Sequence, residues 1–586
     1  MSTSRNRRLA RIFREMAAMS EYLGGTENMF RARVYEKAAQ IISSLTIDIE
    51  DYMKTHDLTK VHGIGKRTVE KIKEFIETGT IKKYEELKQQ VPPDFIELME
   101  VPGLGPKTLK TLHDAFGITT KEQLIEVLKS GKAAQLKGFG PKKIEKILHG
   151  LELLQQSKER ILYWKALQIS RVLVAELKEK VGYKILNIEV AGSLRRGKET
   201  IGDIDILVSA DRKHHHEIIE AFTKLPSVKE VILAGTTKAS IISDEKDRQA
   251  DLRVIVPDQW GAALQYFTGS KDHNVRVREI AREKGLKINE YGVFRIDTNE
   301  KIAGATEEEV YAAIGMQWIP PEMRESRGEV ELALQHKIPN LVSLEDIKGD
   351  MQSHSEWSDG SLSIIKIADF LMKNFKYEYF VLTDHSQAVR VANGLTPERF
   401  LKQIEEIKQI NAELGTDFVK AGAEVDILPD GTLDLPDEIL EKLDFVVASI
   451  HSHFNRDNTD RIIKACQNPY VHVIGHPTGR IIGQRDPYPL NFPQIIEACL
   501  KTGTALEING QPDRMDLPDN LAFEARQAGV MLTVATDAHY NSNFFFMEIA
   551  VKIARRAWCT PQNILNTHSW QEIEEWKERK LKLVKT

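Results

Sequence analysis

The chain has 586 residues, too many for one hydrophobic core, and a prior of about 150 residues per domain predicts roughly three or four domains. Its 41% hydrophobic and 28% charged residues are typical of a globular protein, and its longest apolar runs are too short to cross a bilayer. Cys466, Cys499 and Cys559 are too few and too scattered for a disulfide framework or a zinc ribbon, which fits a reducing compartment such as the cytoplasm.

The formal net charge of −5 hides a difference between the two ends of the chain. Residues 1–150 carry 26 Lys and Arg against 20 Asp and Glu, whereas the remainder carries 55 against 66. A basic front and an acidic back suit a protein that binds polyanions and holds divalent cations. Ordinary solvated surface is the alternative explanation of so mild an imbalance.

The first segment, Met1 to Leu23, is predicted to be an amphipathic helix. Apolar residues such as Leu9, Phe13 and Met16 recur at helical spacing, and no continuous apolar core precedes a cleavage site. An arginine-rich transit peptide is the alternative, which the acidic Glu15 in the same segment disfavours.

Three short stretches of the front share a Gly-apolar-Gly pattern: VHGIGKRT at 61–68, VPGLGPKT at 101–108 and LKGFGPKK at 136–143. In each, a lysine follows within two residues and a helical pattern comes next. The glycines let the backbone turn and approach a ligand, and the amides that open the next helix can face a phosphate oxygen. This helix-hairpin-helix pattern predicts sequence-tolerant, salt-sensitive contact with a nucleic-acid backbone, although a plain turn would explain any single copy. The residues expected to contact DNA here are Gly63, Gly65, Lys66, Gly103, Gly105, Lys107, Gly138, Gly140 and Lys142.

Two carboxylates interrupt an apolar run in AGSLRRGKETIGDIDILV, residues 191–208. Because side chains alternate along a strand, Asp203 and Asp205 point the same way, and burying them together costs several kcal/mol unless a cation or donors offset the charge. Downstream, RQADLRVIV at 248–256 sets Asp251 on a second apolar strand. Three acids could hold two divalent cations, which stabilise the attacking and leaving oxygens of a phosphoryl displacement. Simple capping of a strand end is the alternative for any one of them.

The segment upstream of these acids offers backbone amides, a hydroxyl and two guanidinium groups, which can hold a triphosphate. Here the sequence resembles the family X DNA polymerases, the group that includes polymerase beta. GSLRRG followed by GDIDILV is similar to their nucleotidyl-transfer signature, and YFTGSKDHN at 266–274 is similar to their segment that contacts the incoming nucleotide. The resemblance implies that Asp203, Asp205 and Asp251 bind two Mg²⁺ or Mn²⁺ ions and that Asp251 helps to activate the primer 3′-hydroxyl. It also implies nucleotide binding by Gly192, Ser193, Arg196, Gly202, Tyr266, Gly269 and Asn274.

The resemblance reaches the front of the chain, where FRARVYEKAA at 30–39 and GIGKRTVEKI at 63–72 are similar to the family's 5′-phosphate pocket and lyase site. It implies 5′-phosphate binding by Arg31, Tyr35 and Arg67 and a Schiff-base role for Lys71. An amine attacks the aldehyde of an abasic sugar only when its pKa is low enough to leave it uncharged. A commonplace helical Glu-Lys pair is the alternative for Lys71.

The back of the chain repeats apolar runs that end in metal-ligand residue types. Parallel strands buried on both faces give such runs, and ligands at their carboxyl ends converge on one mouth of a barrel. GDMQSHSEWSDG, TDH, GAEVDI, SIHSH, GHP and TDAH resemble the PHP domain, a metal-dependent phosphoesterase found at the C-terminus of bacterial and archaeal family X polymerases. The implied ligand sets for Zn²⁺ or Mn²⁺ are His354, Glu424 and Asp537; Asp359, Glu424 and His451; and His385, His476 and His539, with His453 second choice to His451.

One position departs from the PHP signature, which opens with His-x-His, whereas this chain reads Gln352, Ser353, His354. A neutral amide is a poorer ligand than imidazole for zinc or manganese. A weak, water-completed or harder-ion-selective first metal site is therefore expected, and slow or lost hydrolysis is the alternative to an active nuclease.

The match covers nearly the whole chain, which is identified as a member of the family X DNA polymerases with a C-terminal PHP domain. The implied fold is multidomain: helical helix-hairpin-helix N-terminal domains, an α+β nucleotidyltransferase palm with a small α/β nucleotide-contacting domain, and a C-terminal α/β distorted TIM-like barrel. The expected boundaries are 1–82 for a helical 5′-phosphate and lyase-like domain, 83–150 for a helical DNA-binding domain, 151–257 for the palm, 258–318 for the nucleotide-contacting domain, 319–347 for a linker and 348–586 for the PHP domain.

The expected activity is gap filling in DNA repair by two-metal nucleotidyl transfer. The PHP domain is expected to add 3′–5′ exonuclease or abasic-site endonuclease activity. The expected partners are gapped or primed double-stranded DNA and dNTPs, with no membrane, for a cytoplasmic monomer. Two alternatives remain: a PHP hydrolase whose front half only delivers DNA, and a non-catalytic DNA-binding scaffold.

Overall fold

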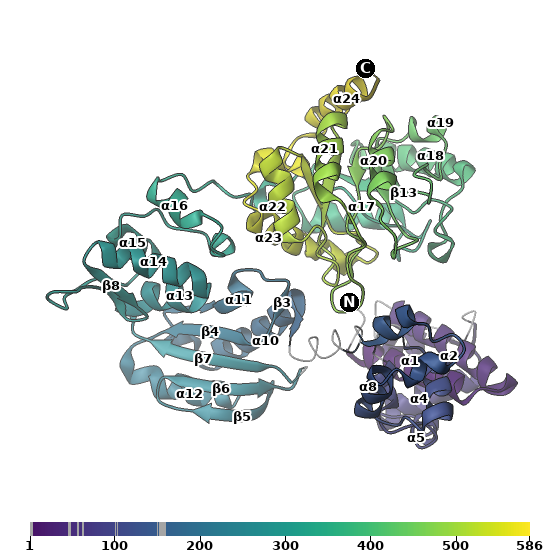
Figure 1. The fold of residues 1–586 in the computed structure, drawn as a ribbon, viewed down its shortest axis with the longest axis horizontal. Coiled ribbons are helices and arrows are strands. Elements are labelled where there is room, and N and C mark those ends of the chain that lie inside the picture. The colour runs from purple at the N-terminus through teal and green to yellow at the C-terminus, as the bar shows by residue number, and fades with distance from the viewer. Residues whose placement is uncertain are drawn as a thin grey trace. The chain divides into compact units, whose positions relative to one another are not determined.

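The structure is a computed structural model that describes residues 4–44, 49–55, 58–60, 64–99, 101, 104–148, 151, 160–245 and 247–585 (Figure 1). Internal contacts divide the chain into two compact units, residues 1–158 and residues 159–586 apart from 483–485. None of the helices in the described ranges combines the length and the apolar composition that a bilayer crossing requires.

The first unit is helical throughout its described residues. Helix α1 (Ser4–Leu23) packs along α2 (Thr26–Ser44), and its Leu9, Phe13 and Met16 are fully buried, which confirms the predicted amphipathic helix. The other elements are α3 (Ile49–Thr55), η1 (Leu58–Lys60), α4 (Lys66–Thr78), α5 (Lys82–Lys88), α6 (Phe95–Met99), α7 (Pro106–Phe116), α8 (Lys121–Lys129), η2 (Lys132–Gln135) and the helical residues 141–148.

The second unit begins with a five-stranded sheet of order β2-β4-β7-β6-β5. Strands β4 and β7 are parallel and the other pairs are antiparallel. Helices α10 and α12 contact each other and this sheet (Figure 1). The elements are β1 (Ile161–Leu162), α10 (Tyr163–Val181), β2 (Asn187–Val190), α11 (Gly192–Arg195), β3 (Thr200–Ile201), β4 (Ile204–Ser209), α12 (His215–Thr223), β5 (Val228–Ala234), β6 (Lys238–Ser243) and β7 (Gln249–Ile255).

A small α/β domain follows, with a three-stranded antiparallel sheet of order β10-β9-β8 and its own core. Its elements are α13 (Trp260–Thr268), α14 (Lys271–Glu283), β8 (Leu286–Asn289), β9 (Gly292–Arg295), β10 (Lys301–Ala303) and α15 (Glu307–Ala313). The segment 319–347, expected as a linker, contains α16 (Glu329–Leu334) and buries Ile319, Met323 and Val330 in this core. It therefore packs with this domain.

Seven parallel strands then follow one another in sequence order as a single sheet. The residues of these strands are buried, as expected for strands covered on both faces. Beyond the first and last strands, Ser353 forms a parallel bridge with Ala538, so the two edges meet and the sheet closes into the predicted TIM-like barrel. The strands are β11 (Gly349–Asp350), β12 (Tyr379–Leu382), β13 (Val419–Asp426), β14 (Phe445–Ser449), β15 (Val473–Ile474), β16 (Ala505–Asn509) and β17 (Leu532–Ala535). The helices are α17 (Ile364–Asn374), α18 (Pro397–Leu414), α19 (Asp437–Leu440), α20 (Thr459–Cys466), α21 (Phe492–Thr502), α22 (Asp519–Ala528), α23 (Met547–Arg556) and α24 (Trp570–Lys585).

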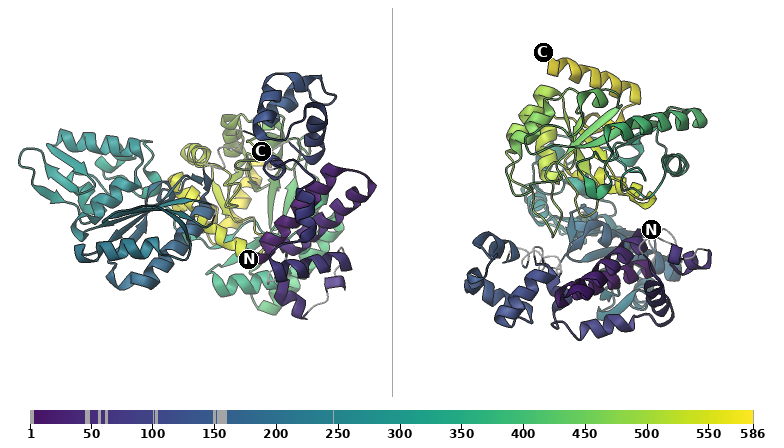
Figure 2. Two further views of the ribbon diagram at one scale, coloured as in Figure 1. Left: turned by 90° about the horizontal axis from the view of Figure 1, so that it is seen from below. Right: turned by 90° about the vertical axis from the view of Figure 1, so that its right-hand side faces the viewer.

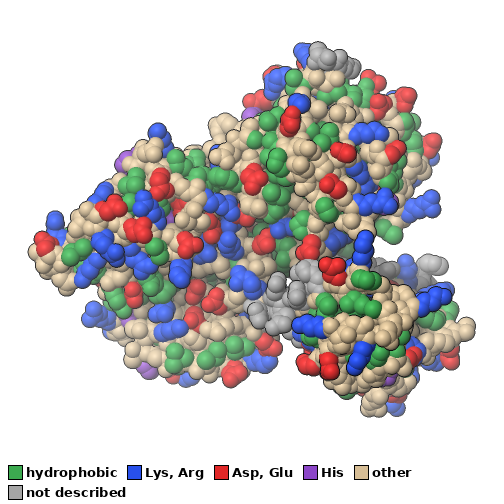
Figure 3. All heavy atoms as spheres, viewed as in Figure 1, with side chains coloured by type: hydrophobic (Ala, Val, Ile, Leu, Met, Phe, Trp, Pro, Cys, Tyr) green, Lys and Arg blue, Asp and Glu red, His purple; other side chains and the backbone are tan. Residues whose placement is uncertain are grey.

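The palm-like sheet and the barrel share one continuous cluster of buried apolar side chains. Trp164 of α10 meets Phe546 edge-on across their boundary, with ring centroids 5.3 Å apart. The second unit is therefore one packed body, seen from two further sides in Figure 2. On the face shown in Figure 3, Lys and Arg side chains are interspersed with Asp and Glu side chains.

Candidate active sites

The palm carboxylates lie on neighbouring strands. Asp205 of β4 and Asp251 of β7 are register partners, and Asp203 lies exposed just ahead of β4. Burial raises the pKa of Asp205 to about 6, and the negative charges of Asp203 and Asp251 add to this effect. A divalent cation would offset the mutual repulsion of these carboxylates, so the donor set fits a metal ion.

Asp251 is held in place by two donors. Lys238 Nζ lies 2.8 Å from Asp251 Oδ2, and Gln249 Nε2 donates to Oδ1 at 3.0 Å. Burial would raise the pKa of Asp251, but these bonds and one from Ser240 lower it. Within the described ranges, the three palm carboxylates do not form a group whose ligand atoms all lie within 4.8 Å of one another. Asp205 and Asp251 are in register, but the three palm carboxylates lie farther apart than the ligand atoms within each barrel group.

Gly192 approaches this site so closely that no side chain fits there. Its φ is +60°, and a Cβ would lie 2.4 Å from Asp205 Oδ2. The glycine opens α11, which ends at Arg195, and Arg196 is its C-cap residue. Arg195 forms a paired bond with Glu307, both at 2.9 Å, which gives it a structural role. Arg196 instead donates from Nη1 to the Thr268 carbonyl at 2.5 Å, beside the YFTGS segment.

The predicted nucleotide-contacting residues lie where α13 gives way to α14. A Cβ at Gly269 would lie 3.2 Å from Arg196 Nη1, so this backbone and the arginine are neighbours. Asn274 is buried, and its amide donates to the Tyr266 carbonyl and accepts from Gln265, both at 2.8 Å. Elsewhere, Ser193 is half-buried in α11, and Gly202 lies close to Arg160. Their roles toward a nucleotide stay predictions.

The barrel ligands converge at the carboxyl ends of the strands. Three groups of side chains place one ligand atom each within 4.8 Å of the others: His354, Asp359, His385 and His539; His385, Glu424 and His451; and His354, Glu424 and Asp537. The third group is one of the predicted sets. The other two groups combine the ligands differently from the predicted sets, because Asp359 lies with His354, His385 and His539. His476 instead contacts Glu424, with Nε2 2.9 Å from Oε1.

The electrostatics of the barrel site fit divalent cations. Several buried ligand atoms have no hydrogen-bond partner among the described residues, including both ring nitrogens of His354 and Oε2 of Glu424. The pKa of Glu424 lies well below its usual value because the neighbouring histidines outweigh its burial. Burial would lower the pKa values of His451 and His539, but the neighbouring carboxylates raise them to about 9. Divalent ions would fit this donor set of imidazoles and carboxylates.

The cavity above these ligands is lined at its rim by apolar and cationic groups. Val389, Val391, Ala392 and Arg514 are among its lining residues, and Arg514 Nε lies 3.8 Å from Asp537 Oδ2. A cavity with a charged floor and an arginine at its wall suits a phosphate ester.

Comparison with known protein families finds four matching segments. Residues 4–81 match the helix-hairpin-helix domain, 95–152 the SAM-like helix-hairpin-helix tandem, 166–251 the DNA polymerase beta palm and 263–325 the DNA polymerase beta thumb. The DNA polymerase/3′-5′ exonuclease PolX of Bacillus subtilis (strain 168) is 40% identical over 575 residues, which cover 97% of this chain and 99% of that protein. This chain belongs to the family X DNA polymerases.

Two further relatives match parts of the polymerase. A "Probable phosphatase" of Thermoanaerobacter sp. (strain X514) is 36% identical over 182 residues, 29% of this chain and 71% of that protein. DNA polymerase lambda of Arabidopsis thaliana is 27% identical over 352 residues, 54% of this chain and 62% of that protein.

The hairpins of this family X polymerase leave helix amides open. Gly65 and Gly105 are the N-caps of α4 and α7, neither helix receives a side-chain cap, and no atom lies within 4 Å of a Cβ built on either glycine. In contrast, Thr120 caps α8 with its own side chain. Gly138 and Gly140 are similarly open, and Lys66, Lys107 and Lys142 are exposed. Gly63 and Gly103 lie outside the described residues.

The predicted 5′-phosphate and lyase residues of the polymerase lie on α2 and α4. Arg67 is exposed and Arg31 pairs with Glu27. Tyr35 is buried against Phe13, with ring centroids 6.0 Å apart. Burial lowers the pKa of Lys71, whose Nζ donates to the Arg67 carbonyl at 3.3 Å.

Gln352 is fully buried in the barrel of the polymerase, and neither atom of its amide has a hydrogen-bond partner among the described residues. Its Oε1 would lie 3.6 Å from a Cβ at Gly475, the residue before His476. The Ser449 hydroxyl next to that position is also buried, and none of the residues in the described ranges forms a hydrogen bond with it. The buried amide therefore lies close to the backbone that leads into His476.

Sequence reasoning missed several supporting residues of this polymerase. Asp426 accepts from His451 Nδ1 at 3.2 Å and orients that ring, and Asp384 accepts from Ser355 and Gln403. Asp426 belongs to the GAEVDI motif and Asp384 to the TDH motif. Each acid is therefore close in sequence to a predicted ligand, and this closeness could have identified it. Arg514 and Lys238 belong to none of the motifs that the sequence analysis used.

Proposed function

We propose that this chain is a DNA-directed DNA polymerase that fills short gaps in DNA, and that its barrel is a metal-dependent nuclease acting on 3′ ends or abasic sites. Membership of family X supports the first activity, and the name of the Bacillus subtilis relative, DNA polymerase/3′-5′ exonuclease, supports the pairing of both. The observation that carries the proposal is the register pairing of Asp205 with Asp251 beneath Gly192.

In the palm, Asp203, Asp205 and Asp251 would hold Mg²⁺ or Mn²⁺. Bound ions would neutralise the triphosphate and stabilise charge on the reacting phosphoryl group. Asp251 stays ionised because Lys238 and Gln249 lower its pKa, as required of a group that receives the proton of a primer 3′-hydroxyl. Arg196, held beside Gly269, would bind the triphosphate through its guanidinium group.

In the barrel, the three ligand groups would hold Zn²⁺ or Mn²⁺. Such ions would polarise the phosphate and supply a nucleophilic water. Asp426 keeps the His451 ring oriented, and Arg514 places a positive charge at the wall of the cavity where a phosphate oxygen would lie.

A DNA substrate with a 5′-phosphorylated one-nucleotide gap tests both activities together. The full-length protein is incubated with and without dNTPs, in Mg²⁺ and in Mn²⁺, beside Asp205→Asn and Glu424→Ala. We expect primer extension to be lost only in the first variant and primer shortening only in the second, because each variant removes ligands from one site.

Asp211→Asn is the matched control for the palm, since Asp211 is an exposed acid with no place in either site. Extension by Asp205→Asn at the wild-type rate would contradict the polymerase assignment. Loss of shortening in Asp205→Asn together with extension would point to a folding defect, which unfolding curves of both variants would reveal.

The phosphatase relative favours a second reaction for the barrel, removal of a 3′-terminal phosphate. A primer that ends in a 3′-phosphate distinguishes the two. Release of inorganic phosphate without nucleotide loss would support phosphomonoester hydrolysis, and release of nucleotides alone would exclude it.

The remaining proposals concern partners and setting. We propose gapped or primed duplex DNA and dNTPs as ligands of a monomer that works in the cytoplasm. The open helix amides of α4 and α7 support the proposal of DNA binding. The three cysteines, all buried free thiols, support the proposal of a cytoplasmic location.

A further inference from the structure

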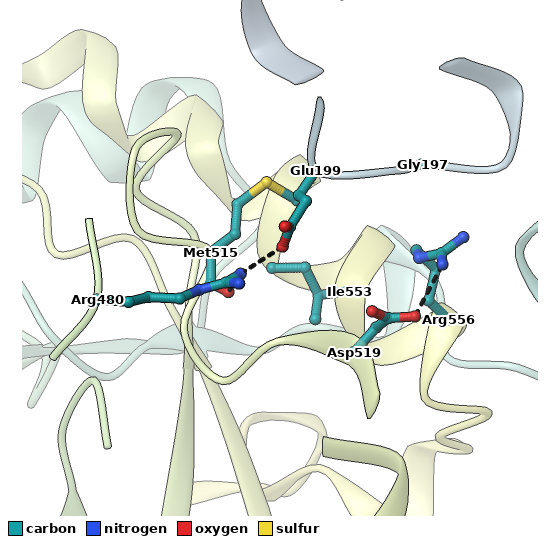
Figure 4. A pocket seen from close by; sticks show the side chains of 7 residues that line it. All are labelled: Gly197, Glu199, Arg480, Met515, Asp519, Ile553 and Arg556. Atoms are coloured by element: carbon teal, nitrogen blue, oxygen red, sulfur yellow. Dashed lines mark hydrogen bonds and ion pairs between the residues drawn. The ribbon is translucent and has the colours of Figure 1, made fainter. Parts of the chain in front are cut away.

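The loop that carries Arg196 rests on the barrel. Gly197, with φ +72°, has no room for a side chain, because a Cβ would lie 2.4 Å from Cγ of Lys552 on α23. Figure 4 shows this loop passing over the cleft lined by Asp519 and Arg556. Arg556 Nη1 donates to the Arg196 carbonyl at 2.7 Å. The barrel therefore fixes the backbone of the residue proposed to bind the triphosphate.

A shared carboxylate joins the same two arginines through their side chains. Glu325 Oε1 lies 3.0 Å from Arg196 Nε and 3.0 Å from Arg556 Nη1. Lys198 Nζ approaches the other oxygen of Glu325 at 3.4 Å. The side chains of Arg556, Glu325 and Arg196 are only 2%, 11% and 12% exposed, so solvent screens this cluster weakly.

Arg556 is itself held by the barrel. Its Nη2 donates to Asp519 Oδ2 at 2.8 Å, the contact drawn in Figure 4, and Asp519 also accepts from Arg327 at 2.7 Å. One planar guanidinium group thus reaches Asp519, Glu325 and the Arg196 carbonyl at once. A lysine could supply the charge but not this fork of donors.

The cluster determines both the orientation of the Arg196 side chain and the charge of its surroundings. Glu325 takes Nε and the Thr268 carbonyl takes Nη1, which fixes the plane of the guanidinium group. Burial would raise the pKa of Glu325, but Arg556 and Arg196 lower it, so it carries a negative charge. Without Arg556, that charge would face an incoming triphosphate and compete with it for Arg196.

We propose that Arg556 of the barrel is a positioning residue for nucleotide binding at the palm. It holds the Arg196 backbone, shares Glu325 with Arg196 and offsets the Glu325 charge near the polyanionic substrate. The inference rests on the proposed function, because it requires that Arg196 binds the dNTP triphosphate. It makes the barrel part of the nucleotide site as well as the nuclease site.

The test compares Arg556→Met, Arg556→Lys and Arg171→Met in the full-length protein. Arg171→Met is the matched control, because Arg171 also pairs across the palm-barrel boundary, with Glu548 at 2.7 Å, but touches nothing in the cluster. We expect the KM for dNTP to rise about tenfold in Arg556→Met and less in Arg556→Lys, with kcat within about threefold and the exonuclease rate unchanged. Arg171→Met should leave all three unchanged.

A cycle with Arg196→Met separates this inference from the proposed function. If Arg196→Met leaves the KM for dNTP at the wild-type value, the proposed role of Arg196 fails first. If it raises the KM, adding Arg556→Met should raise it little further, because the residue to be positioned is gone. Full additivity, a wild-type KM in a folded Arg556→Met, or a parallel fall of polymerase and exonuclease rates would overturn the inference. Should Arg556→Met not fold, the same cycle with Arg556→Lys decides.

Discussion

Asp205 of β4 and Asp251 of β7 are register partners on one face of the palm sheet, and Lys238 forms an ion pair with Asp251 at 2.8 Å. Asp205 keeps a raised pKa in consequence of burial and of its acidic neighbours. This difference between the two acids predicts how the stability of the metal-free protein changes with pH and with removal of the Asp205 charge.

Removal of the Asp205 charge should stabilise the metal-free protein at neutral pH. Folding raises its pKa from 3.8 to about 6, so the folded state gains stability as pH falls through about 6 and loses it above. We expect Asp205→Asn in EDTA at pH 7.5 to raise the free energy of unfolding by up to about 3 kcal/mol. The gain should shrink between pH 7 and pH 5, as thermal unfolding curves would show.

Added Mg²⁺ should reverse this order, because it stabilises the wild type more than Asp205→Asn. The exposed Asp211→Asn serves as the control and should follow the wild type. A variant Asp205→Asn that is less stable than the wild type in EDTA at pH 7.5 would show that the carboxylate is not under repulsion.

Gly192→Ala should abolish polymerisation while sparing the nuclease. The new methyl group would lie 2.4 Å from Asp205 Oδ2 in a backbone with φ +60°, so either the helix start or the carboxylate must move. We expect extension to fall at least about a hundredfold, as for other misplaced catalytic groups. Gly235→Ala, in the connection between β5 and β6 of the same sheet, is the control, because the nearest atom to its Cβ would be 3.4 Å away. Equal losses in both variants would mean general damage to the palm.

Local patterns predicted the parts of the fold that depend on neighbours in sequence. The buried face of α1 follows from helical spacing, and the fully buried strands of the barrel follow from continuous apolar runs. The pairing of Asp205 with Asp251 needed the strand order β4-β7, which a resemblance suggested and periodicity could not. The contact between Arg556 and Glu325 joins residues 231 positions apart, and local sequence patterns do not predict such a contact.

Gln352→His should strengthen metal binding in the barrel. The buried amide has no hydrogen-bond partner within the described part of the chain, and imidazole is a better ligand than an amide for zinc or manganese. We expect the affinity for Zn²⁺ or Mn²⁺, measured by competition with a chromophoric chelator, to rise about tenfold or more. Gln494→His adds the same ring on an exposed face of α21 and should not change it. Unchanged affinity in Gln352→His would place that residue outside the ligand shell.

Lys71 should form a reducible adduct with an abasic sugar. Burial lowers its pKa below that of a free lysine, so more of the amine is uncharged at neutral pH. Borohydride trapping on a 5′-incised abasic substrate should yield a covalent complex that Lys71→Arg loses. Its yield should rise with pH and level off below pH 10.5, the ordinary lysine value. Lys73→Arg, an exposed change on the same helix, should trap normally, and trapping by Lys71→Arg would identify another nucleophile.

The hairpin lysines should set the salt dependence of DNA binding. Lys66, Lys107 and Lys142 follow open helix starts, and each phosphate contact contributes about 0.9 to the slope of log affinity against log salt. Replacing all three with alanine should lower that slope by up to about 2.7, as fluorescence anisotropy with a gapped duplex would show. The exposed Lys82, Lys129 and Lys132 give a control with the same change of charge. Equal slopes in the two triple variants would mean that net charge, and not the hairpins, governs binding.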